Sequence, residues 1–414
     1  MTDPAMPHAE LLITRARLAE GTMVNIAVAG GKITAITPAG DAPPSASQAA
    51  NCFDAGGDLL LPGFVEGHCH LDKTWFGLPW MENETGLGIA ERAGYEREVE
   101  ARIAYPTALR AGRLIEQMVA CGSTRIRSHV DIAPAEGLTR LEGLLAARET
   151  YRSAAAIQIV AFPQMGVMRH AGMIDLLDAA LAAGADVLGG IDPAGIDGDI
   201  SGPLDALFAL AAKRAVGLDF HLHTAGSLGI HELEQIALRT VANGMQGRVT
   251  ASHAHSLGSS PRDVQLAMAD KLAAAGIAVC TYAPGWVEPP PLALLHGAGV
   301  TVFAGSDNVR DAWQPYGTGD MLERAWIVAY RSAFRRDSEF RFAHQMVTSL
   351  GAKACGFEGH RLAVGDDADC VVLAAENIAD AICRRPPRRY VIRQGRIVAR
   401  DGRYLGPTHS MEAA

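Results

Sequence analysis

Histidine and carboxylate side chains recur in this sequence at the ends of short apolar runs. The first are the pair His68 and His70, and His221 and Asp307 follow later runs. Residues i and i+2 of a strand point to the same side, so the two imidazoles of the H-x-H pair can share one ion. Three imidazoles and one carboxylate suit a divalent transition metal, Zn²⁺ or Fe²⁺, with one position left for water. The pattern predicts a single metal ion bound by His68, His70, His221 and Asp307.

Another histidine, His253, ends a further apolar run. Because four ligands are already assigned, its imidazole is free to act as an acid or base, or to orient a water at the metal. A metal ion lowers the pKa of a bound water toward neutrality, and the hydroxide so formed can attack an electrophilic carbon. His253 and Asp307 are therefore predicted catalytic groups of a hydrolase.

The elements that must position these residues are short strands alternating with helices. Helical periodicity connects the later apolar runs, as in residues 174–184, 203–216 and 264–276. Eight such units predict a (β/α)8 barrel, in which catalytic groups lie at the C-terminal ends of the strands. A doubly wound sheet is the alternative, although it usually has fewer strands. The eight runs are 59–70, 123–133, 156–166, 185–195, 217–226, 248–256, 277–285 and 300–308.

The polar residues at the ends of these runs include seven of the 14 histidines. The fourth run ends in GGIDPAG, residues 189–195, which contains no lysine. Barrel hydrolases with two metal ions bridge them with a carbamylated lysine at that strand end. We therefore expect one metal ion. His129 and Asp131, at the end of the second run, either orient a ligand histidine or make ordinary hydrogen bonds.

The two chain ends differ from the middle. Residues 1–61 and 356–414 contain short β-type runs broken by glycine-rich turns, which predicts one small β-sandwich domain built from both ends. Residues 62–355 would form the barrel. The long interval between the first two runs carries Trp75 and Trp80 before a helix near 108–120. It is either a lid or pocket wall, or packing beneath the small domain.

Composition narrows the class of protein. The chain has 414 residues, of which 49% are hydrophobic, and a net charge of −9. This excludes a disordered chain and disfavours nucleic acid as a partner. No apolar run approaches the roughly 18 residues that a membrane-spanning helix needs. The seven cysteines are scattered without a C-x-x-C motif, which favours a reducing compartment. We expect a cytoplasmic protein without a membrane partner, and a homo-oligomer is possible.

Four segments resemble the amidohydrolase superfamily in its cytosine-deaminase-like branch, and the likeness covers nearly the whole chain. They are LPGFVEGHCHLDK, HLHTAG, VTASHAHSLG and GSDNVRDAWQPYGTGDM. The resemblance implies the same four metal ligands and a His253 that assists the attacking water. It also implies a small heterocyclic substrate. Gln164 would contact the carbonyl or amide edge of the ring and Trp313 would pack near its plane, with Asn308 also in the substrate site.

One departure from that branch concerns the proton shuttle. Cytosine deaminases carry a glutamate three residues after the histidine of the fifth strand, and here Thr224 occupies that position. Asn308 likewise replaces a second aspartate. Another group must then protonate the leaving amine, and His223, Lys73 and His253 are the candidates. A metal ion near Lys73 would depress the pKa of the amine and make it a donor. The alternative is a structural ion pair with an acid such as Asp72.

The sequence thus predicts a mononuclear metal-dependent aminohydrolase that removes an amino or alkylamino group from a pyrimidine or s-triazine ring. A second possibility is the opening of a cyclic amide, as in hydantoinase or dihydroorotase chemistry, which the missing lysine disfavours. A third possibility, from a different class, is a non-catalytic scaffold or sensor.

Overall fold

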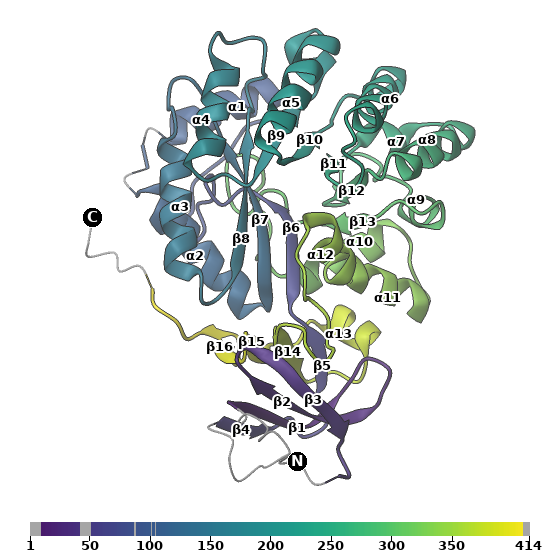
Figure 1. Ribbon diagram of the computed structural model, residues 1–414. Coiled ribbons are helices and arrows are strands. Elements are labelled where there is room, and N and C mark those ends of the chain that lie inside the picture. Colours follow the sequence, from purple (N-terminus) through teal and green to yellow (C-terminus); the bar gives the residue numbers. More distant parts are fainter. Residues whose placement is uncertain (1–9, 42–50, 87, 101, 104, 409–414) are drawn as a thin grey trace, which may run out of the picture.

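The computed structural model describes residues 10–41, 51–86, 88–100, 102–103 and 105–408. The parts of the expected small domain at 1–9, 42–50 and 409–414 lie outside this description. Figure 1 shows a barrel of strands wrapped by helices, with a separate sheet below it. The chain therefore has the (β/α)8 barrel and the two-ended second sheet that the sequence predicts.

Eight parallel strands follow one another around the barrel in chain order. Each of the eight apolar runs contributes one of them. Their residues are almost all buried, because helices cover the outside and side chains fill the inside, which is why they read as continuous apolar runs. The strands are β6 (Phe64–Cys69), β7 (Ser123–Asp131), β8 (Ala156–Phe162), β9 (Val187–Ile191), β10 (Gly217–His221), β11 (Val249–Ser252), β12 (Ala278–Thr281) and β13 (Val302–Ala304).

Helices surround these strands (Figure 1). Among the described residues, none of them is long and apolar enough to cross a membrane. They are α3 (Thr139–Tyr151), α4 (Met173–Ala183), the short π-helix η2 (Pro193–Asp197), α5 (Ser201–Arg214), α6 (Gly226–Ala242), α7 (His255–Ser259), α8 (Arg262–Ala274), α9 (Leu292–Gly297), α10 (Met321–Arg331), α11 (Asp337–Met346) and α12 (Ser349–Cys355).

The second sheet joins the two chain ends. Its strand order is β17-β16-β15-β14-β5-β1-β2-β3, with β4 paired to β1. The antiparallel pair β5–β14 connects the N-terminal and C-terminal halves. Its elements are β1 (Leu11–Arg17), β2 (Met23–Ala29), β3 (Lys32–Pro38), β4 (Asn51–Asp54), β5 (Leu59–Pro62), β14 (Cys370–Leu373), β15 (Arg388–Arg393), β16 (Arg396–Arg400) and β17 (Arg403–Tyr404), with α13 (Ile378–Arg384) after β14.

The long interval between β6 and β7 contains two helices, α1 (Ile89–Glu100) and α2 (Thr107–Ala120). The second is the expected helix. The first was not predicted from the sequence, because IAERAGYEREVE has almost no apolar periodicity. Trp75 and Val99 from this interval pack in a small buried cluster with Ala312. The interval therefore packs against the loop that follows β13, at the mouth of the barrel.

The barrel closes along a seam between β13 and the end of β6. Asp307 donates its backbone N–H to the carbonyl of His68 over 2.8 Å, and His70 donates to the carbonyl of Asp307 over 3.2 Å. Cys69 and Asp307 form the parallel bridge between the two segments. Gly305 makes this close approach possible, because a Cβ there would lie 2.5 Å from backbone atoms of His68.

A substitution at this seam provides a test. Gly305→Ala should destabilise the fold by about 2 kcal/mol or more, because neighbouring backbone cannot move away cheaply. Thermal unfolding would measure the loss. Gly297→Ala is the matched control, since a Cβ at that position has nothing within 4 Å. Equal melting temperatures for the two variants would contradict this account of the seam.

Candidate active site

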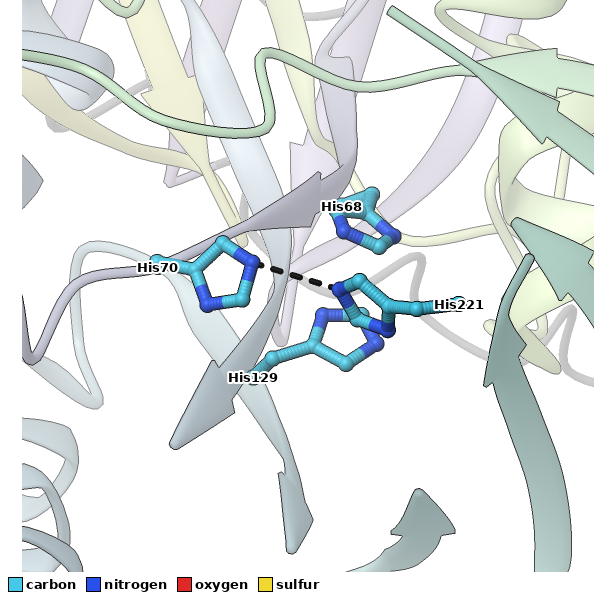
Figure 2. Close-up of side chains that lie close together, drawn as sticks. All are labelled: His68, His70, His129 and His221. Carbon is cyan, nitrogen blue, oxygen red and sulfur yellow. Dashed lines mark hydrogen bonds between the residues drawn. The ribbon is translucent and has the colours of Figure 1, made fainter. Parts of the chain in front are cut away.

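The four predicted metal ligands converge at the C-terminal mouth of the barrel. Nε2 of His68 lies 3.6 Å and Nε2 of His70 3.4 Å from Oδ1 of Asp307. Nε2 of His221 lies 3.3 Å from that of His70. Figure 2 shows His68, His70 and His221 facing one another, with His129 beside them. Two buried imidazole nitrogens this close need a proton or a cation between them, so the geometry fits a metal ion.

A buried hydrogen-bond chain fixes the orientation of His68. Ser252 at the end of β11 donates its hydroxyl proton to Oδ1 of Asp219 over 2.7 Å. The Ser252 oxygen therefore accepts from Nδ1–H of His68 over 3.0 Å, and the lone pair of His68 stays on Nε2. Arg127 completes the chain by donating to the other oxygen of Asp219 over 3.0 Å. Nε2 of His68 has no hydrogen-bond partner among the described residues, as a ligand atom requires.

Burial sets the charge of the ligands. It lowers the pKa of His70 and His221, and the neighbouring imidazoles lower that of His221 further. For Asp307, burial alone would raise the pKa, but the surrounding imidazoles, His253 foremost, hold it well below its usual value. The cluster thus presents three imidazoles and one carboxylate, the donor set that Zn²⁺ and Fe²⁺ accept.

Several non-glycine residues at the mouth have left-handed backbone conformations. The φ angles are 70° at His253, 44° at Ala254, 53° at Ala283 and 60° at Asp307. Such conformations cost energy and persist where the surrounding structure holds them. Here they turn the chain sharply after β11, β12 and β13. His253 is buried by this turn, and burial lowers the pKa of its imidazole well below the usual value.

His223 is paired with a carboxylate from the neighbouring strand. Its Nδ1 lies 2.7 Å from Oδ2 of Asp192, which follows β9. Asp192 also accepts from the backbone N–H of Thr224 over 2.9 Å and from its hydroxyl over 3.1 Å. Burial lowers the pKa of His223, but the Asp192 carboxylate outweighs this and raises it overall. Asp192 thus holds the ring in one orientation, with Nε2 left free.

A cavity of about 200 Å³ opens above the ligand cluster. Phe162 and Tyr282 supply apolar walls, and Arg92 of α1 reaches its rim. His68 and His253 are not among its lining residues. The cavity brings together most of the predicted site residues: His70, Lys73, Gln164, His221, His223, Asp307, Asn308 and Trp313.

The carboxylates around Lys73 act on the pKa of its amine in the direction opposite to that expected from a nearby metal ion. Burial lowers the pKa of the amine, but the carboxylates of Glu96, Asp131 and Asp72 outweigh burial and raise it. The nearest carboxylate is Glu96 of α1, whose Oε2 is 3.5 Å from Nζ, rather than the expected Asp72. Lys73 also donates to Oε1 of Gln164. Lys73 is therefore a cation held among carboxylates, and its role as a proton donor stays a prediction.

Three further polar residues lie at the strand ends: His129, Asp131 and His255. His129 lies against His68, with ring centroids 4.0 Å apart, and burial lowers its pKa to about 3. Its Nε2 lies 3.6 Å from Oδ2 of Asp219, and one of its nitrogens lies within 4.8 Å of ligand atoms of His68, His70 and His221. Asp131 accepts from the backbone N–H of Gln164 over 3.4 Å. The described residues contain two clusters of possible ligand atoms, and His255, which lines the cavity, belongs to neither: they are His68, His70, His129 and His221, and His68, His221, His253 and Asp307.

Sequence reasoning missed four residues that position this site. Glu96 lies on the unpredicted helix α1. Asp219 lies in the middle of a strand, where only its burial in an apolar run was a signal. Asp192 was noted at a strand end but received no role. Asp311 accepts from Nδ2 of Asn308 over 2.6 Å and from the backbone N–H of Trp313 over 2.8 Å.

Comparison with known proteins agrees with this geometry. Residues 51–399 match the amidohydrolase family. The chain belongs to the amidohydrolase family. It is 31% identical over 363 residues to N-isopropylammelide isopropyl amidohydrolase of Pseudomonas sp. strain ADP, a match that covers 84% of this chain and 88% of that protein.

Two solved structures extend the comparison. N-isopropylammelide isopropylaminohydrolase from Burkholderia multivorans superposes with a TM-score of 0.91 at 43% identity, covering 95% of this chain and 99% of that one. A 5-methylcytosine deaminase from Klebsiella pneumoniae gives 0.84 at 27% identity, covering 97% and 100%. This member of the family is therefore an enzyme that hydrolyses carbon–nitrogen bonds, and the scaffold alternative is wrong.

The orientation of His68 can be tested without measuring turnover. Ser252→Ala should weaken metal binding by about 10- to 100-fold, because Nδ1 loses its acceptor and the ring loses its fixed tautomer. Competition with a chelator would measure the affinity. Ser123→Ala is the control, since this serine is also buried in a barrel strand and its hydroxyl has no hydrogen-bond partner in the described structure. Unchanged affinity in the Ser252 variant would refute the role of the chain.

Proposed function

We propose that this enzyme is a mononuclear metal-dependent aminohydrolase that releases an amino or alkylamino group from an s-triazine or pyrimidine ring. The observation that carries the proposal is the position of His223, paired with Asp192, on the wall of a small cavity that is also lined by His70, His221 and Asp307 of the ligand cluster. The similarity to the isopropylammelide enzymes favours a triazine with an alkylamino substituent.

The ligand cluster fits one divalent ion, Zn²⁺ or Fe²⁺. When bound, such an ion would supply a Lewis acid that polarises water for attack on a ring carbon. His253, buried beside the cluster with both ring nitrogens unpartnered in the described structure, is placed to accept a proton from that water. Its lowered pKa keeps the imidazole neutral and able to act as a base.

His223 is placed to deliver a proton to the leaving nitrogen. Asp192 binds Nδ1–H, so Nε2 is the atom that can carry a transferable proton when the ring is charged. The ring stacks on that of His253 with centroids 4.7 Å apart, so the two imidazoles are direct neighbours. The proton taken from water at one ring and the proton given to the amine at the other are thus handled by neighbouring groups.

Other residues that line the cavity are suited to bind the substrate. Nζ of Lys73 lies 5.5 Å from the ring centroid of Trp313 and 5.9 Å from that of Phe162. Aromatic faces and a cation suit a flat heterocycle with carbonyl oxygens. Gln164 and Asn308, which also line the cavity, add amide groups for hydrogen bonds to the ring edge.

Product mass is the experiment that tests this function. Metal-loaded protein incubated with N-isopropylammelide should release isopropylamine and leave a ring carbonyl, and cytosine should react poorly because Thr224 cannot shuttle a proton. Chelation of the metal should abolish both reactions. A product that gains water without losing nitrogen would show cyclic amide opening instead, and no product from either compound would refute the proposed substrate class.

A substitution tests the proton donor. Asp192→Asn should lower kcat by about 10²- to 10⁴-fold while metal content is retained, because His223 loses its orienting carboxylate. A halogenated triazine releases halide without a proton, so its hydrolysis should be much less affected. Asp186→Asn, which alters a carboxylate at the opposite end of β9, is the control. Equal losses with both leaving groups would assign Asp192 a structural role.

A further inference from the structure

One buried carboxylate behind the cavity wall contacts several groups that face the cavity. Oε2 of Glu96 accepts from Nε1–H of Trp313 over 2.6 Å and from Nε2 of Gln164 over 3.2 Å, and lies 3.5 Å from Nζ of Lys73. Its other oxygen accepts from Arg140 over 3.0 Å. Glu96 is 3% exposed and does not line the substrate cavity.

These contacts fix which way the amide of Gln164 points. A carboxylate only accepts hydrogen bonds and an ammonium only donates them. The NH₂ of Gln164 must therefore face Glu96, and its carbonyl oxygen must face Lys73, which donates to it. A flipped amide would place two acceptors together and two donors together. The orientation of the amide follows from the charges on either side of it.

The donors and acceptors that these contacts leave unpaired determine what the wall presents to a ligand. Lys73 has three N–H donors, of which two are directed at Gln164 and Glu96, so one is left. Gln164 has one N–H left, and one of the two lone pairs of its oxygen accepts from Lys73, so the wall keeps two N–H donors against one lone pair. The indole N–H of Trp313 is directed at Glu96, so the ring surface rather than the donor is available. The wall therefore offers N–H donors.

We propose that Glu96 is a positioning residue that makes this wall a donor surface and thereby selects heterocycles with carbonyl oxygens, rather than amino groups, at that edge. The proposal rests on the proposed function and narrows its substrate class to rings with two or more oxo groups beside the alkylamino substituent. An amino group at that edge would bring its own hydrogens against Lys73 and Gln164 and leave buried donors unpaired.

The surrounding charges agree with this role. Burial alone would raise the pKa of Glu96, but Lys73 and Arg140 lower it to about 2, so it stays ionised. The groups that face Lys73 are the carboxylates of Glu96, Asp131 and Asp72 and the cation of Arg140, with His70 nearby. Removal of the Glu96 charge should therefore let the Lys73 amine lose its proton at lower pH.

The experiment compares two substrates that differ in one group, an alkylamino-dioxo-s-triazine and the alkylamino-amino-oxo-s-triazine. The wild-type enzyme should favour the dioxo ring in kcat/KM by at least about a hundredfold. Glu96→Gln should reduce that preference by at least about tenfold. The alkaline limb of its kcat/KM profile, where activity falls as pH rises, should also shift to lower pH. Glu96→Gln that keeps the full preference and the wild-type alkaline limb would overturn the proposal.

Two variants on the same helix are controls. Glu98→Gln removes an equal charge at a side chain that is 68% exposed and should leave the preference unchanged. Glu100→Gln breaks the ion pair with Arg110 that anchors α1, so it should lower stability without moving the preference or the alkaline limb. If Glu100→Gln moved them as Glu96→Gln does, the effect would come from the helix as a whole and the proposal would be refuted.

A double variant covers the case in which Glu96→Gln does not fold, and a binding measurement separates the wall from the proposed function. If Glu96→Gln does not fold, the charge-balanced double variant Lys73→Met/Glu96→Gln should fold and have no preference, and a retained preference would refute the proposal. Calorimetry with trioxo-s-triazine and triamino-s-triazine tests the wall without turnover. If wild-type protein prefers the trioxo ring but releases no amine from any triazine, the donor wall is supported and the proposed function fails; equal binding of the two rings overturns the donor wall.

Discussion

The backbone pairing that closes the barrel is the constraint on which the site depends. His68 and His70 lie on one side of the seam, Asp307 lies on the other, and they are joined by backbone hydrogen bonds of 2.8 and 3.2 Å. Glu66 precedes His68 on the same face of β6. Its carboxylate adds a further link across the seam by accepting from the backbone N–H of Ser306 over 2.8 Å. Closure of the barrel and assembly of the ligand set are thus one event. A metal ion that bridges the seam would stabilise the closed form by mass action, because the open chain has no comparable site.

Buried charges on either side of the ligand cluster follow a common rule. Within the barrel, the carboxylate of Asp219 is compensated by Arg127 and, through Ser252, orients a ligand histidine. In the cavity wall, Glu96 is compensated by Lys73 and orients the groups that face the ligand. A buried charge without a partner is costly, so each such residue must hold its partners in place. The charges that the fold must neutralise are the ones that align the functional side chains.

The sequence revealed the parts of this arrangement that depend on local pattern. Barrel strands are buried on both faces and read as apolar runs, and the polar residue that ends each run lies at the mouth. This was enough to find His68, His221 and Asp307. It could not find Glu96, because α1 has no apolar stripe. For Lys73, a candidate proton donor, it offered Asp72 as an example of an ion-pair partner, whereas the nearest carboxylate comes from α1. Residues that are distant in sequence and meet only in the folded protein leave no periodic pattern in the sequence.

The replacement of a glutamate by Thr224 illustrates how one substitution is tied to another. The Thr224 hydroxyl donates to Asp192, and the same carboxylate holds His223. A longer acidic side chain at this position would bring a second negative charge against Asp192 and remove one of its donors. Thr224 and His223 therefore share one carboxylate, and a glutamate at position 224 would act against the contacts that hold Asp192 and, through it, the ring of His223.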